Sequence, residues 1–227
     1  MIEETYFETF LFISKNKYQI FVYDKNNLKN LYNKEIKIID TIELKNLSDF
    51  LDENIYKIEK KINNFIKNII LIIEDERVLD VAISIKKKNY EKYLDQKHLE
   101  NSLVEVKDVF RENYQDQIIM HMIVVDNENN FLLNNNINND YLFLEINFIS
   151  ITNNFTFYFD KLLESHKIKI SRYMSYKYIK SHIGEDPTDL SIMANKLNDG
   201  LNKNEVQLIS KSVKNIGFFE KFFQLFS

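Results

Sequence analysis

Glycine restricts this chain more than any other residue, because it is nearly absent. The 227 residues contain three glycines, Gly184, Gly200 and Gly217, where average usage would supply about 16. All three lie far apart in the last quarter of the sequence. A phosphate-binding loop needs glycines at close, fixed spacing so that the backbone can approach the phosphate. The sequence therefore disfavours nucleotide enzymes that hold phosphate on a glycine-rich loop.

Composition disfavours several other classes of protein. The chain has no cysteine, so it can form no disulfide framework, thiolate metal site or cysteine nucleophile. A net charge of −4 gives no general attraction to nucleic acid. No stretch reaches the roughly 18 apolar residues of a membrane-spanning helix, and the acidic start at residues 1–4 is unlike a signal peptide. The 44% hydrophobic content suffices for one domain or two small ones.

The first 75 residues predict the order β-β-β-α-β. Residues 5–14 and 18–23 are rich in aromatic and β-branched residues and flank a short polar break, which is typical of a hairpin. Residues 35–42 and 68–73 are two further candidate strands. A helix between them is expected to begin at Ser48 and Asp49. Its buried apolar stripe is expected to consist of Leu51, Ile55, Ile58, Ile62, Phe65 and Ile66.

The next residues predict a second block of strands and helices, so the fold class expected for the whole chain is α/β, of the α+β kind. Strands are expected at 78–86, 117–125 and 141–151, with a helix at 94–113. A polar, asparagine-rich loop is expected at 126–140. The remaining expected elements are helices at 154–167, 173–183 and 189–201, a short strand at 168–170, and a helix or linker at 202–215.

No group of residues in the sequence forms a recognisable catalytic, metal or cofactor-binding motif. None of the four histidines is three or four residues from another, so no helix-borne metal pair is expected. His121 lies in an apolar strand and is expected to point to solvent. The acids at 74–76 are expected to form a solvated turn, with a catalytic carboxylate pair as the alternative. The lysines at 86–88 are expected to be a solvated strand end, with a phosphate contact as the alternative.

The C-terminal segment is unusually aromatic for a chain end. On a helical wheel, residues 216–226 place their apolar side chains on one half. One interpretation is an amphipathic helix that lies in a membrane interface; the other is a helix that packs on the protein's own core or on a dimer partner. The membrane-binding residues of the first interpretation are Ile216, Phe218, Phe219, Phe222, Phe223, Leu225 and Phe226, with Lys214 and Lys221 among the lipid headgroups.

Element order and tail together resemble FtsA, the actin-like protein that tethers the bacterial division ring to the membrane. Residues 5–73 look like the opening of an actin-like (ribonuclease-H-like) subdomain. Residues 78–170 look like the small domain that FtsA inserts there, with Gln117–Asp126 (QIIMHMIVVD) similar to the family's strand that ends in aspartate. The segment Gly217–Ser227 (GFFEKFFQLFS) is similar to the family's membrane-targeting helix.

The resemblance implies a division into segments. A partial actin-like subdomain is expected at 1–77 and 171–184, and the inserted FtsA-type interaction domain at 78–170. A helical or linker region is expected at 185–215, and the membrane-targeting helix at 216–227.

The chain also departs from the family. The family's Asp-x-Gly turn between the first two strands reads Ser14-Lys15-Asn16 here, and the second actin lobe has no counterpart. We therefore expect no ATP binding and no other cofactor, and binding to the tubulin-like FtsZ is in doubt.

The function implied is that of a non-enzymatic scaffold of the cell-division machinery, acting in septum formation. It would be a cytoplasmic protein, peripheral on the inner face of the cell membrane. Its partners would be that membrane and either division proteins or further copies of itself, bound through the inserted domain, with no nucleic acid. The alternative is a cytosolic protein-interaction module or a pilus-assembly relative of actin-like fold.

Overall fold

The computed structural model describes residues 6–38, 44–88, 96–125, 141–183 and 189–206. The chain divides into two compact units. The first unit contains residues 1–78 and 152–201, and the second contains residues 79–151 and 202–227. The predicted membrane helix at 216–227 lies outside the described residues.

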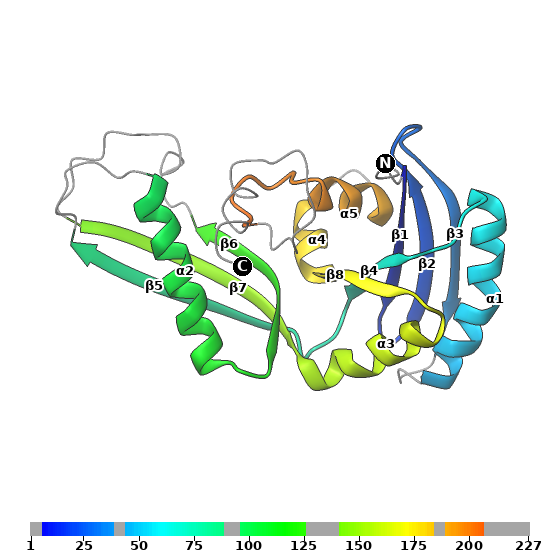
Figure 1. Ribbon diagram of the computed structural model, residues 1–227, viewed down its shortest axis with the longest axis horizontal. Helices are drawn as coiled ribbons and strands as arrows, with labels where there is room; N and C mark the ends of the chain where they lie inside the picture. The colour runs from blue at the N-terminus through cyan, green and yellow to red at the C-terminus, as the bar shows by residue number, and fades with distance from the viewer. Residues whose placement is uncertain (1–5, 39–43, 89–95, 126–140, 184–188, 207–227) are drawn as a thin grey trace. The chain divides into compact units, whose positions relative to one another are not determined.

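The first unit is built on a five-stranded sheet in the order β3-β2-β1-β4-β8 (Figure 1). Its strands are β1 (Phe7–Ile13), β2 (Lys17–Asp24), β3 (Lys29–Lys37), β4 (Asn68–Ile73) and β8 (Lys169–Ser175). The first three strands form an antiparallel meander, whereas β4 and β8 run parallel to β1. Both faces of β1 and β4 are buried, which explains their nearly continuous apolar sequences.

Helices cover both faces of this sheet: α1 and α3 lie on one face and α4 and α5 on the other (Figure 1). Their bounds are α1 (Leu44–Ile62), α3 (Asn153–Ser165), α4 (Tyr176–His182) and α5 (Leu190–Asn198). Alternating side chains of the hairpin reach opposite layers. The ring of Tyr18 lies 6.3 Å from Phe50 of α1, and the ring of Phe12 lies 5.0 Å from Tyr176 of α4.

Two expectations about the first unit were wrong in detail. The helix α1 starts at Leu44 and ends at Ile62, because Asn63 adopts a left-handed conformation with φ of 52°. Phe65, expected on the buried stripe, therefore follows the helix and is 75% exposed. The third strand was expected at 35–42, but β3 begins and ends earlier in the sequence. The reason is that the chain turns directly after Asp24 and pairs with β2 from Lys29 onward.

The last strand of the sheet is also longer than expected. The sequence predicts a strand at 168–170 and a helix from Tyr173, but β8 continues to Ser175. Pairing with β4 holds this segment extended as far as the pair Ile73 and Ser175. The Ser175 side chain then accepts a hydrogen bond from the Tyr178 amide and caps α4.

Among its described residues, the second unit is a three-stranded sheet in the order β5-β7-β6 with the helix α2 on it (Figure 1). Its elements are β5 (Leu79–Lys88), α2 (Gln96–Asn113), β6 (Gln117–Val125) and β7 (Tyr141–Thr152). Apolar side chains of α2 and of β7 meet in one core, in which the rings of Phe110 and Phe148 stack at 4.5 Å. In the sequence, Leu99, Leu103, Val106 and Phe110 recur at helical spacing, and Leu144, Ile146 and Phe148 alternate along the strand; both patterns predict this core correctly.

The insertion between β4 and β8 is shorter in the structure than the expected span of 78–170. The first segment of the second unit ends at Ile151, and α3 and β8 belong to the first unit. The physical reason is that β8 completes the five-stranded sheet by pairing in parallel with β4. Residues 202–206 return to the second unit, where Glu205 forms an antiparallel bridge with Ile123 of β6.

Candidate functional site at the β1–β2 turn

The turn between β1 and β2 lies at the carboxyl end of β1, and β4 and β8 end at the same edge of the sheet because they run parallel to it. Ligands of open α/β sheets bind outside the carboxyl ends of the parallel strands. The sequence at this turn reads Ser14-Lys15-Asn16. It is therefore the part of the first unit to test for ligand binding.

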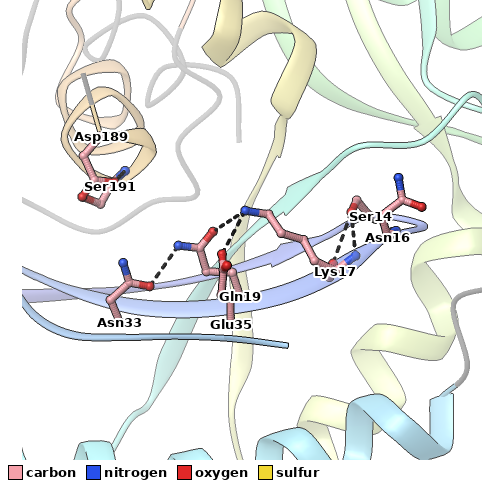
Figure 2. Close-up of polar contacts among 8 residues, drawn as sticks. All are labelled: Ser14, Asn16, Lys17, Gln19, Asn33, Glu35, Asp189 and Ser191. Atoms are coloured by element: carbon pink, nitrogen blue, oxygen red, sulfur yellow. Dashed lines mark hydrogen bonds and ion pairs between the residues drawn. The ribbon is translucent and has the colours of Figure 1, made fainter. Parts of the chain in front are cut away.

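The hydroxyl of Ser14 forms hydrogen bonds with the backbone amides of this turn. Its Oγ accepts hydrogen bonds from the backbone amides of Asn16 and Lys17 at 3.2 and 3.1 Å, and it donates to the Lys17 carbonyl at 3.3 Å (Figure 2). Ser14 is 3% exposed. A hydroxyl has one donor and two acceptor sites, so all three are used. Two amides that could otherwise point at an anion are thus satisfied from within the turn.

The charged groups next to the turn are paired with one another. Lys15 lies 3.0 Å from Glu76, and Arg77 holds Asp75 through two hydrogen bonds of 2.7 Å. The Arg77 side chain holds the pKa of the Asp75 carboxyl below its usual value. The same guanidinium lies 4.0 Å above the ring of Phe155. Of the acids at 74–76, for which a carboxylate pair was the alternative considered above, Asp75 and Glu76 are engaged by basic side chains.

A polar ladder continues from the turn across β2 and β3 (Figure 2). The ammonium of Lys17 lies 3.2 Å from Glu35 and donates to Gln19 at 3.1 Å. Gln19 in turn donates to Asn33 at 2.9 Å. Gln19 and Glu35 are direct partners in the register of the two strands, so the ladder follows from strand pairing. It leaves Lys17 bound within the protein.

Helix α5 is tied to the sheet at its first turn. Asn30 of β3 donates to Asp189 at 2.8 Å and to Ser191 at 2.7 Å. The Asp189 side chain is itself the N-cap of the helix, since it accepts from the Ser191 amide. One asparagine on the edge strand therefore holds the start of α5.

A second network holds the end of α5. Lys25 lies 2.8 Å from both Glu8 and Asp199, and Asn198 donates to both oxygens of Glu8 at 3.0 Å. Burial raises the pKa of the Glu8 carboxyl despite the neighbouring ammonium. Burial opposes the charge on Lys25, but hydrogen bonds to Asp199 and Glu8 outweigh it and raise the pKa of the ammonium. Strand β1, the β2–β3 turn and α5 are joined by this one cation.

His121 of the second unit differs from the sequence expectation. It was expected to face solvent, but it is 1% exposed, and its Nδ1 lies 2.7 Å from Oε1 of Glu205, itself 3% exposed. Backbone hydrogen bonds beside this pair join Val124 to Asn204 and Val206 to Met122. The two residues are 84 positions apart, and no spacing rule could connect them. A histidine flanked by two methionines in an apolar strand was the one available signal.

Of the other predicted site residues, some lie within the described residues and some do not. All nine predicted membrane-binding residues, between Lys214 and Phe226, lie outside the described residues. The lysine run at 86–88 is in part internally engaged, since Lys87 pairs with Glu105 and Lys86 lies 5.0 Å from the ring of Phe143. Among the described residues no group of three or more metal-ligating side chains lies together. No helix of the described part of the chain is long and apolar enough to cross a membrane.

Comparison with solved structures shows the fold. The type IV pilus biogenesis complex of PilM and PilN matches with a TM-score of 0.50 and 7% identity, over 76% of this chain and 48% of that one. The cytoplasmic domain of EpsL, an inner membrane component of the type II secretion system of Vibrio cholerae, matches with a TM-score of 0.39 and 7% identity, over 74% and 55%. A Bacteroides thetaiotaomicron protein with an actin-like ATPase fold and unknown function matches with a TM-score of 0.35 and 14% identity, over 81% and 61%.

The sequence itself gives no such match: no protein-family model matches it, and neither does any curated protein. The chain spans about half the length of the pilus protein that it matches. At 7% identity that likeness concerns fold alone. The expected α/β fold of actin-like type is confirmed, and the likeness does not single out FtsA.

Proposed function

We propose that this chain is a non-enzymatic scaffold of actin-like fold that does not use ATP and acts through contacts with other proteins. The observation that carries the proposal is the Ser14 hydroxyl, which takes two amides of the turn where the resembled family binds phosphate. Lys15 and Lys17, the nearest cations, are bound to Glu76 and Glu35. An incoming phosphate would have to displace these contacts.

Calorimetric titration of the full chain with magnesium ATP tests the proposal that the chain does not bind the nucleotide. We expect no saturable heat. A saturable heat with one site per chain that is lost in Asn16→Asp would overturn the proposal, because that change adds negative charge to the turn itself. Asn64→Asp, the same change at an exposed position outside the turn, is the matched control.

The proposal includes a place at the inner face of the cytoplasmic membrane. It is motivated by the amphipathic pattern of residues 216–226 and by their resemblance to the FtsA targeting helix. Flotation of the full chain with liposomes of anionic and neutral lipid is expected to exceed that of a chain ending at Asn215. Phe222→Asp should reduce flotation, whereas Lys221→Gln should change it little. Equal flotation of the full and shortened chains would overturn the membrane contact.

The machinery that the scaffold serves has two candidates. The tail favours cell division and septum formation, as in FtsA, with FtsZ binding in doubt. The second candidate is an assembly of the pilus or secretion type, favoured by the likeness to the protein of the PilM–PilN complex. A fluorescent fusion in the organism of origin separates them: a ring at mid-cell that depends on residues 216–226 supports division, and its absence in dividing cells contradicts it.

A further inference from the structure

The strand β5 forms one edge of the sheet of the second unit, and no strand within the described residues pairs with its outer side. Natural edge strands are usually protected by charges, proline or bulges along their length. The central five residues of β5, Val81–Ile85, contain no charge and no proline, and their pairing with β7 runs without a register shift. This edge is therefore able to accept another strand.

The apolar face of β5 is also incompletely covered. Val81, Ile83 and Ile85 point to the core beneath α2 but remain half-buried. The corresponding residues of the neighbouring strand β7, Leu144 and Ile146, are fully buried. An additional strand beside β5 would cover the exposed part of this apolar row.

The sequence of β5 is complementary to itself in the antiparallel direction. When Ile83 faces Ile83 of a second copy, Val81 faces Ile85 on the core side of the sheet. On the other face, Ala82 meets Ser84, and Asp80 meets Lys86 twice, once on each side of the two-fold axis. Opposite charges and apolar pairs directly across an antiparallel ladder are the stabilising combinations.

The neighbouring symmetric registers are poorer. Centring the pair on Ser84 keeps a contact of opposite charges, between Asp80 and Lys88, but it moves Val81 from Ile85 to Lys87, which is engaged by Glu105, so fewer apolar pairs remain across the ladder. Centring it on Ala82 removes the contact between Asp80 and Lys86 and places the lysine opposite Val78. Any shift by an odd number of residues would put apolar side chains opposite polar ones.

We propose that two copies of the chain associate through their β5 strands, in antiparallel pairing about Ile83, and join their sheets into one of six strands. The inference builds on the proposed scaffold function by naming a second copy of the chain as one partner. The interface is isologous, as in most symmetric dimers. A single strand pair buries less surface than a standard interface, so the dimer is expected to depend on concentration.

Sedimentation velocity of the full chain over a concentration series tests the proposal. The wild-type chain should shift from monomer to dimer as concentration rises. Asp80→Lys and Lys86→Asp should each weaken dimerisation by about tenfold or more, because each places like charges opposite one another at two symmetric positions. The double variant Asp80→Lys/Lys86→Asp should recover the dimer. Lys88→Asp, the same charge change on the same face but opposite Val78, is the matched control.

Crosslinking checks the register separately. The chain contains no cysteine, so Ile83→Cys introduces one thiol at the two-fold centre and should form a covalent dimer on mild oxidation. Ile85→Cys should not, because its counterpart in the second copy is four residues away along the strand. A wild-type chain that stays monomeric at its highest soluble concentration, or a double variant that fails to recover the dimer, would overturn the proposal. Neither result affects the nucleotide titration or the liposome test, which do not involve β5.

Discussion

His121 and Glu205 form a buried pair in which the imidazole Nδ1 lies 2.7 Å from the carboxylate. It fixes residues 202–206 against the edge of β6, where two backbone hydrogen bonds flank it. Isolated ionisable groups are costly to bury, so each partner depends on the other. Residues 202–206 are thus held to the second unit by this pair and by the two backbone hydrogen bonds beside it.

Glu205→Ala should destabilise the second unit by about 3 kcal/mol, because it leaves the buried imidazole without its partner. Glu205→Gln, which retains an acceptor oxygen, should cost less. The measurement is urea unfolding combined with hydrogen exchange at the Val124 and Val206 amides, which should exchange faster in the alanine variant. Glu112→Ala, at an exposed position on α2, is the control and should leave both amides unchanged. Unaltered protection in Glu205→Ala would show that the pair does not hold the segment.

Ser14→Ala should lower the free energy of unfolding of the first unit by about 1–2 kcal/mol, since it leaves two amides of a nearly buried turn without their acceptor. Amide exchange at Asn16 and Lys17 should accelerate, because their donors are released. Lys15→Ala serves for comparison and should cost less than about 0.5 kcal/mol, because it removes only an exposed ion pair. A Ser14→Ala chain as stable as Lys15→Ala would contradict the capping role.

Acidic pH should remove the contribution of the Asp75 carboxylate to the free energy of unfolding. Its folded pKa lies below the ordinary value of 3.8 because of the hydrogen bonds from Arg77. The carboxylate therefore stabilises the fold at pH values above 3.8, and this contribution disappears as the pH falls through the lower folded pKa. Asp75→Asn should cost about 1 kcal/mol at neutral pH, because the Arg77 side chain is half exposed although the Asp75 side chain that it binds is 1% exposed.

The test of Asp75 is the pH dependence of unfolding in both chains. The difference in stability between wild type and Asp75→Asn should be constant at neutral pH and shrink in acid. Asp49→Asn, an exposed carboxylate on α1, should show a smaller change over the same range. A difference that grows on acidification would have the wrong sign and would refute the assignment.

Lys25→Met should destabilise the docking of α5 by about 1–3 kcal/mol, because Glu8 and Asp199 would face each other without their shared cation. Lys25→Arg should recover part of the loss. Hydrogen exchange within α5 and thermal unfolding measure the effect, and Lys29→Met at the exposed first position of β3 is the control. Equal protection of α5 in both methionine variants would argue against the network.

Local patterns located most of the elements. The run of six residues at 68–73 coincides with β4, and the run at 117–125 coincides with β6. The stripe through Leu51, Ile55 and Ile58 is the buried face of α1. These predictions succeed because side-chain periodicity records which face of an element is covered. The same patterns located the β1–β2 turn, but they said nothing of what its donors bind.

Tertiary structure alone decided the long-range contacts of the fold. Only the folded chain brings Glu205 to His121, Lys25 to Asp199, and β8 beside β4. Each of these pairs is separated by many residues, and the free energy that favours it comes from burial and pairing rather than from local propensity. Periodicity could place Phe65 on a helical face, but only the backbone turn at Asn63 removed it from that face. The scarcity of glycine in the sequence disfavoured a phosphate-binding loop. The fold showed in addition that the Ser14 hydroxyl accepts the hydrogen bonds of two backbone amides in the β1–β2 turn.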